Sequence, residues 1–77
     1  MSDLLVFELE FTEKGQLQSA FGLLIDHDGV ESCSVELDAM SARFMAAGGV
    51  GSALVERIYE VGGLRWCSRH AVPGQAG

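Results

Sequence analysis

Large apolar side chains occupy every second position near the start of the chain, at Leu5, Phe7, Leu9 and Phe11. Glu8 and Glu10 lie between them. Because successive side chains of a strand point to opposite faces, residues 4–12 are predicted to form a strand with one buried face and one acidic, exposed face. An isolated strand or hairpin is at best marginally stable, so the rest of the chain must complete a sheet and cover its apolar side.

The next segments favour two further strands. Residues 13–16 (EKGQ) are typical of a turn. Residues 17–25 fit two patterns, since their apolar side chains form a helical stripe and also alternate along the segment. Gly22 weakens a helix by about 1 kcal/mol relative to alanine. Residues 26–29 (DHDG) are a strong turn signal before the alternating residues 30–37, so we interpret 17–25 as the middle strand of a three-strand meander.

The second half of the chain favours two helices. Residues 39–47 are rich in helix-forming side chains and follow Asp38, a candidate N-cap. Gly48 and Gly49 are typical of a helix end. A second helix is expected over residues 52–61, whose first residue is another candidate N-cap and whose apolar side chains form one stripe. Gly62 and Gly63 are expected to end it.

Residues 64–72 predict a last strand, because apolar and polar side chains alternate again. Trp66 shares a face with Leu64 and is expected in the core. Arg65 and Arg69 fall on the other face. There they would pair with the acidic row, the outward-facing carboxylates Glu8, Glu10 and Glu36, if this strand lies beside it.

The length of 77 residues fits one domain, near the size at which a single core is only marginally sufficient. We predict a compact α+β domain over residues 1–72, in which an antiparallel sheet of three to four strands packs on two short helices in the order β-β-β-α-α-β. Residues 73–77 (PGQAG) are predicted to form a flexible tail.

Charge is distributed unevenly along the chain. Residues 1–38 contain nine Asp and Glu side chains and one Lys, whereas residues 39–77 contain two Glu and four Arg, for a formal net charge of −6. Phosphates and anionic membrane surfaces repel such a chain, so we expect direct binding to neither nucleic acid nor membrane. The expected partner is a basic protein surface. The candidate partner-binding residues are Glu8, Glu10, Asp26, Asp28, Glu31 and Glu36.

No catalytic, cofactor or metal site is predicted. Glu8 and Glu10 would share one exposed strand face, whereas paired catalytic carboxylates need different environments. Residues 26–29 lack the ligand spacing of a calcium loop. Residues 48–52 (GGVGS) lack the lysine and the spacing of a phosphate-binding loop. We therefore expect a binding protein and not an enzyme.

Cys33 and Cys67 are too few for a disulfide framework. Free thiols buried as small apolar groups are the favoured interpretation, and a disulfide within or between chains stays open. A zinc site that also uses His27 and His70 is disfavoured, because the sequence holds no closely spaced ligand pair.

The longest uncharged apolar stretch, residues 20–25, is much shorter than the about 20 residues that span a bilayer. Residues 1–3 lack the basic segment that begins a secretory signal. We therefore expect no membrane segment and a cytoplasmic location.

A small, acidic α+β domain without a catalytic motif resembles phage-encoded anti-CRISPR proteins. The resemblance covers the whole chain in size and charge, rests on no motif and assigns no residue. It implies an inhibitor that binds a Cas subunit in the host cytoplasm and blocks target DNA or a neighbouring subunit. The alternative is a homo-oligomeric structural or assembly protein of a phage or bacterium, with Met40, Phe44 and Met45 of the predicted helix as its apolar interface.

Overall fold

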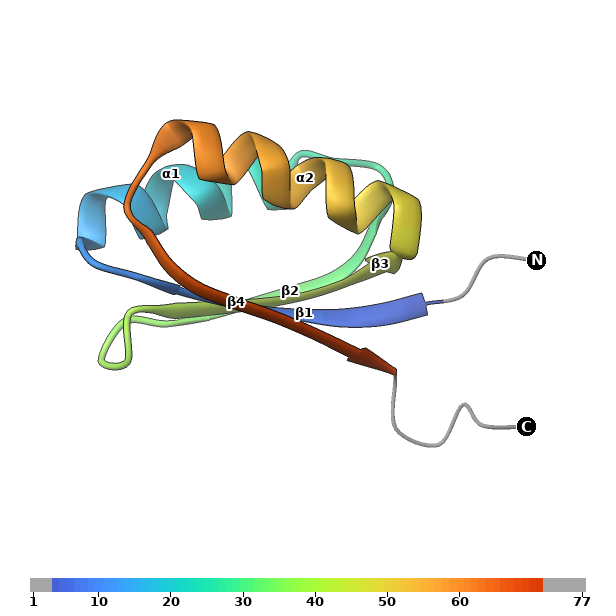
Figure 1. Ribbon diagram of the computed structural model, residues 1–77, viewed down its shortest axis with the longest axis horizontal. Coiled ribbons are helices and arrows are strands. Elements are labelled where there is room, and N and C mark those ends of the chain that lie inside the picture. The colour runs from blue at the N-terminus through green and yellow to red at the C-terminus, as the bar shows by residue number, and fades with distance from the viewer. Residues whose placement is uncertain (1–3, 72–77) are drawn as a thin grey trace.

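The computed structural model describes residues 4–71, which form four strands and two helices. In chain order these are β1 (Leu4–Phe11), α1 (Lys14–Ile25), β2 (Val30–Glu36), β3 (Ser41–Ala47), α2 (Gly48–Val61) and β4 (Leu64–Ala71). The strands make one sheet in the order β2-β3-β1-β4, and both helices lie on the same face of it (Figure 1). The predicted tail, residues 73–77, and the last residue of the predicted domain lie outside the described residues.

All three neighbouring strand pairs are antiparallel. It follows that β1 and β2 are parallel to each other with β3 between them, and that β3 and β4 are parallel with β1 between them. The two β-α-β units are therefore interlocked, which is the ferredoxin-like or split βαβ arrangement. The predicted α+β class with an antiparallel sheet is confirmed, but the element order is β-α-β-β-α-β.

The first difference from the sequence prediction is that residues 17–25 are helical. They belong to α1, whose inner stripe of Leu17, Ala20 and Leu24 is buried against the sheet. The helical periodicity was therefore the correct one of the two patterns. The cost of Gly22 is offset by the burial of this stripe, since tertiary packing outweighs the helix propensity of one residue.

The second difference is that residues 41–47 are not helical but form β3, a central strand. Ala42, Phe44 and Ala46 alternate along the buried helix-side face of the sheet. The high helix propensity of alanine is only a weak prior, and here small side chains on a central strand let two helices approach the sheet closely. Asp38 is accordingly not an N-cap and lies in the turn between β2 and β3.

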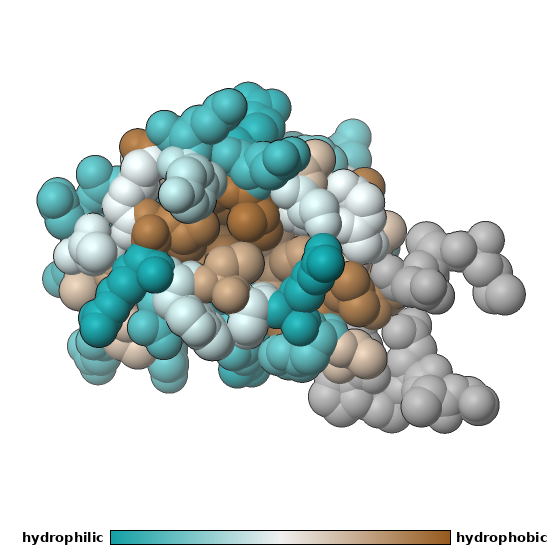
Figure 2. All heavy atoms as spheres, in the orientation of Figure 1, coloured by the Kyte–Doolittle hydropathy of each residue, from teal (hydrophilic) through white to brown (hydrophobic). Residues whose placement is uncertain are grey.

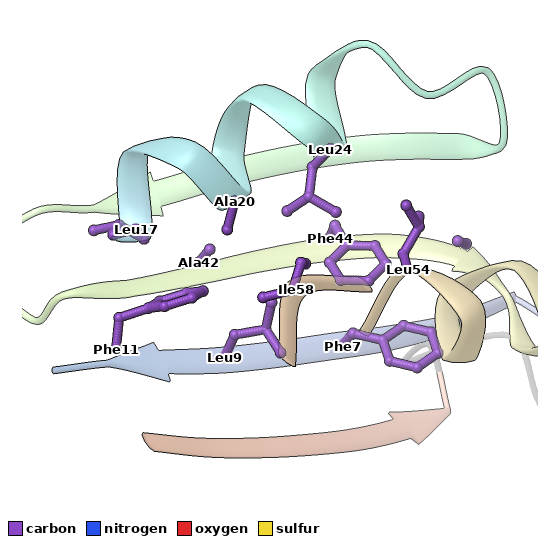
Figure 3. Close-up of a cluster of buried hydrophobic side chains, with 11 residues drawn as sticks. Phe7, Leu9, Phe11, Leu17, Ala20, Leu24, Ala42, Phe44, Leu54 and Ile58 are labelled. Atoms are coloured by element: carbon purple, nitrogen blue, oxygen red, sulfur yellow. The ribbon is translucent and has the colours of Figure 1, made fainter. Parts of the chain in front are cut away.

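The core lies between the helix-side face of the sheet and the inner stripes of α1 and α2 (Figure 3). Phe7 of β1 and Phe44 of β3 are directly opposed in register, and their rings stack with centroids 4.9 Å apart. Offset-stacked aromatic pairs of this kind contribute beyond their buried area. The predicted alternation of β1 is thus confirmed on its buried side.

Helix α2 starts earlier than predicted, because Gly48 and Gly49 are its first residues and not the end of a preceding helix. Gly51 explains the need for small residues here. A side-chain carbon at Gly51 would lie 2.1 Å from the Phe7 ring, so only glycine lets the helix start rest on that ring. At the other end, Gly62 and Gly63 take positive φ values of 97° and 81° and end the helix as expected.

Candidate interaction surfaces

The face of the sheet opposite the helices, here called the open face, carries the predicted acidic positions Glu8 and Glu10. Arg43 of β3 lies directly opposite Glu8 in register, and its Nη2 is 2.7 Å from Glu8 Oε2. Sequence reasoning missed this pairing because residue 43 was assigned to a helix. One carboxylate of the predicted row is therefore already neutralised within the protein.

Glu10 and Glu36 lie at the same end of the open face. Both are register partners of Ser41, and Glu10 is also opposite Trp66 of β4. Trp66 is 47% exposed and lies on the open face, so its predicted place in the core is wrong. The register shifts between Glu10 and Phe11, so Arg65 has no partner residue on β1. Because of this one extra residue, Trp66 and Leu64 lie on opposite faces of the sheet and do not share one.

Five exposed carboxylates follow β2, an edge strand of the described sheet, and the two turns that flank it. We call this set the acidic edge; its members are Asp26, Asp28, Glu31, Glu36 and Asp38. No Lys or Arg occurs between residues 15 and 42. Within the described residues, none of the five is within ion-pairing distance of a basic side chain. Four of the six predicted partner-binding residues therefore gather here, while Glu8 and Glu10 lie on β1.

The other edge strand, β4, has the opposite charge. We call its exposed Arg65 and Arg69 the basic edge. Arg69 is the register partner of Phe7 and lies on the helix side of the sheet, where its Nη1 donates a hydrogen bond of 3.1 Å to Ser52 Oγ. The expectation that Arg69 would face the acidic row is therefore wrong. Ser52, expected as an N-cap, lies inside α2 and instead accepts this hydrogen bond.

A hollow of about 310 Å³ lies between α2 and β4. It arises because α1 packs over β1, β2 and β3 and α2 over β1 and β3, which leaves the helix side of β4 largely uncovered. Its lining residues are Phe7, Ser52, Val55, Cys67, Ser68 and Arg69. Figure 2 shows an apolar patch on this side of the molecule, below the hydrophilic outer surface of the helices.

A second hollow, of about 220 Å³, lies at the other side of the sheet. Its lining residues are Ser34, Val35, Glu36, Ser41 and Arg43. The hydroxyls, the carboxylate and the guanidinium form a polar surface next to the acidic edge. No nucleophile and general base of the kind a catalytic pair requires are hydrogen-bonded to each other among these side chains.

Cys33 and Cys67 are not joined to each other by a disulfide. Cys33 is half-buried on β2, and burial raises its pKa. Cys67 of β4 is exposed, contrary to the expected burial. Partial desolvation raises the pKa of the Cys67 thiol, and the neighbouring Arg69 guanidinium opposes this rise. The two residues lie on opposite edge strands of the sheet.

Residues 26–29 connect α1 to β2, so the predicted turn is present but joins a helix to a strand. His27 Nδ1 accepts a hydrogen bond of 3.0 Å from the Gly29 N–H, which closes the turn locally. Within residues 4–71, no three His, Cys, Asp or Glu side chains are placed to hold a metal ion. Neither helix of this range is long and apolar enough for a membrane span.

The alternative interface predicted for Met40, Phe44 and Met45 does not exist as one helical surface. Phe44 is fully buried in the core, whereas Met45 is on the open face opposite Val6. Met40 lies in the β2–β3 turn.

Comparisons with protein-family models, with curated proteins and with solved structures gave no significant match to the chain.

Proposed function

We propose that this chain is a small acidic binding protein that inhibits a nucleic-acid-binding partner, with a Cas effector subunit as the candidate partner. The observation that carries the proposal is the acidic edge. Its five carboxylates are exposed, lie on or beside one strand and have no basic neighbour within ion-pairing distance in residues 4–71. A channel that binds phosphates attracts such a surface for the same electrostatic reason.

The fold supports this role because it holds the charges in place. Glu31 and Glu36 belong to a strand that is paired with β3, and the turn at residues 26–29 is closed by a hydrogen bond. A surface that is ordered before binding loses little conformational entropy in the complex. Complementary charge also raises the association rate and makes it sensitive to salt.

Direct binding to nucleic acid is a poorer explanation. Sheets of this topology that bind RNA stack bases on aromatic side chains of the open face. Here the central strands present Glu8, Glu10 and Arg43 on that face. The carboxylates repel phosphates, and the guanidinium is engaged by Glu8.

The test is a competition titration against a panel of purified Cas effector complexes, with binding of labelled target DNA as the readout. At least one effector is expected to lose DNA binding at a stoichiometric amount of the chain, and the inhibition should weaken steeply with added salt. The triple variant Asp28→Asn, Glu31→Gln, Glu36→Gln should inhibit at least about tenfold less well, which corresponds to about 1.4 kcal/mol.

The matched control is Glu56→Gln with Glu60→Gln, which removes two exposed carboxylates from α2, away from the acidic edge. This control should inhibit like the wild type. Inhibition by the triple variant at wild-type strength would contradict the role of the acidic edge. If every effector in the panel keeps its DNA binding, the Cas assignment is wrong.

A further inference from the structure

We propose that the basic edge of one copy of this chain binds the acidic edge of a second copy, so that β2 of the second copy continues the sheet beyond β4 of the first. This proposal concerns self-association and does not rest on the proposed inhibitory function.

The backbone geometry permits this pairing without any change of fold. β2 and β4 are antiparallel within one copy, since each neighbouring pair in the order β2-β3-β1-β4 is antiparallel. If a second copy is moved across the strands until its β2 lies beside β4 of the first copy, these two strands are antiparallel. The helices of both copies then lie on the same side of the extended sheet. The lengths match, with seven residues in β2 and eight in β4. Addition of a strand to a free edge gains main-chain hydrogen bonds.

Charge selects this pairing over the alternatives. Two β2 edges would bring carboxylates together, and two β4 edges would bring Arg65 and Arg69 against their own copies, so both symmetric pairings are repulsive. Only the β2–β4 combination is attractive. Across the sheet, Glu36, Ser41, Glu10 and Trp66 are successive register partners. If the second copy is displaced without a shift along the strands, its Glu36 therefore lies opposite Trp66 of the first copy. The Glu36 carboxylate is then close to the guanidinium of Arg65, the residue next to Trp66.

Apolar surface is also complementary. The Gln16 side chain of α1 lies against Gly63, at the end of α2. Ile25 follows Gln16 by nine residues, which is about two and a half helical turns, so it lies on the flank of α1 away from α2. Ile25 is 56% exposed there, and β2, an edge strand, is the strand that α1 packs on most extensively.

In the paired arrangement this flank of α1 faces the hollow between α2 and β4 of the neighbouring copy. The apolar part of the lining of this hollow is Val55, Cys67 and the buried Phe7, and an apolar patch lies below the helices on this side of the molecule (Figure 2). Burial of Ile25 against these side chains would remove apolar area from water on both copies. The helix side of β4, which is largely uncovered within one copy, would then be covered by α1 of the second copy.

The arrangement joins two different surfaces, so it is head-to-tail and does not stop at a symmetric dimer. Such contacts make a closed ring if the sheet twist brings the ends together and an open series if it does not. Sedimentation velocity and light scattering of the full chain at increasing concentration should show reversible assembly beyond the dimer that weakens with salt.

A charge-reversal pair tests the contact directly. Arg65→Glu with Arg69→Glu makes the strands β2 and β4 both acidic, and Glu31→Arg with Glu36→Arg makes both strands basic. Each variant alone should stay monomeric at concentrations where the wild type assembles. An equimolar mixture should assemble again, because each contact between unlike variants joins an acidic strand to a basic strand. Circular dichroism of each variant checks that the fold is kept.

The apolar contact is tested by Ile25→Ser, with Val61→Ser as its control. Each residue ends its helix, and they are 56% and 46% exposed, but Val61 is on α2. Ile25→Ser should weaken assembly about tenfold or more, and Val61→Ser should leave it unchanged. The proposal is overturned by a wild type that stays monomeric at high concentration, by a dimer that survives both charge reversals, or by a mixture that fails to assemble. A monomer would leave the inhibitor proposal standing.

Discussion

The Glu8 carboxylate and the Arg43 guanidinium meet at 2.7 Å across the β1–β3 register, in the middle of the open face. Their side chains are 29% and 63% exposed, so water screens the attraction. The coupling free energy from a double-mutant cycle with Glu8→Gln and Arg43→Gln should be below about 1 kcal/mol. Urea unfolding at low and high salt measures it, and the coupling should shrink as salt rises. A coupling of several kcal/mol that ignores salt would contradict this account.

Gly51→Ala is expected to lower the free energy of unfolding by about 1–3 kcal/mol, because the added methyl group would overlap the buried Phe7 ring. Gly22→Ala is the matched control. A side-chain carbon at Gly22 meets nothing within 4 Å, and the residue lies inside α1, so alanine should stabilise by about 0.5–1 kcal/mol. Chemical denaturation of both variants gives the comparison. Equal effects of the same sign would be inconsistent with the described packing.

Phe44→Ala should remove about 3–5 kcal/mol of stability, since it deletes a fully buried ring that stacks on Phe7. Met45, the next residue, is on the open face, and Met45→Ala should cost distinctly less. Thermal or urea unfolding distinguishes the two. If the Phe44→Ala variant were as stable as the Met45→Ala variant, the buried position of Phe44 would be contradicted.

Stability should fall in mild alkali because of the two thiols. Burial raises the pKa of both Cys33 and Cys67 in the folded state. A thiol whose pKa is higher in the folded state than in the unfolded state favours folding while it is protonated. Its contribution to the free energy of unfolding is complete below the unfolded-state pKa of about 8.5, and it is lost as the pH rises through the folded-state pKa. The melting temperature of the wild type, measured with reductant, should therefore drop more between about pH 8 and pH 10 than that of Cys33→Ala with Cys67→Ala. If the melting temperatures of the wild type and of the double variant fell equally with pH, the two thiols would not contribute to the pH dependence of stability.

Local patterns predicted the ends of the fold better than its middle. The alternation of Leu5, Phe7 and Leu9 located β1, and the paired glycines after Val61 located the end of α2. These signals are local, because a pleat or a positive φ is imposed by the residues themselves.

The middle of the chain was harder because its residues fit two periodicities. Residues 17–25 satisfy both a helical and an alternating pattern, and Ala42 and Ala46 are good helix formers that occupy a central strand. Which pattern is used depends on the partner element, and that information is not local.

The candidate surfaces followed from the sequence only in part. The charge difference between the two halves of the chain is visible in the sequence, but its conversion into opposite edges depends on strand order, which places β2 and β4 at the two ends of the sheet. The Arg43 pairing and the exposed Trp66 depend on register and could not be read from spacing.

The most direct test of the acidic edge is a two-dimensional ¹H–¹⁵N NMR titration of the labelled chain, dilute and at low salt, with a short oligolysine peptide as a defined basic probe. The largest shift changes should fall in residues 26–38, should be small in β4, and should disappear as salt is added. Changes that centre on Glu8 and Glu10, on the outer surface of α2, or evenly over the molecule would contradict the claim that the acidic edge is the binding surface.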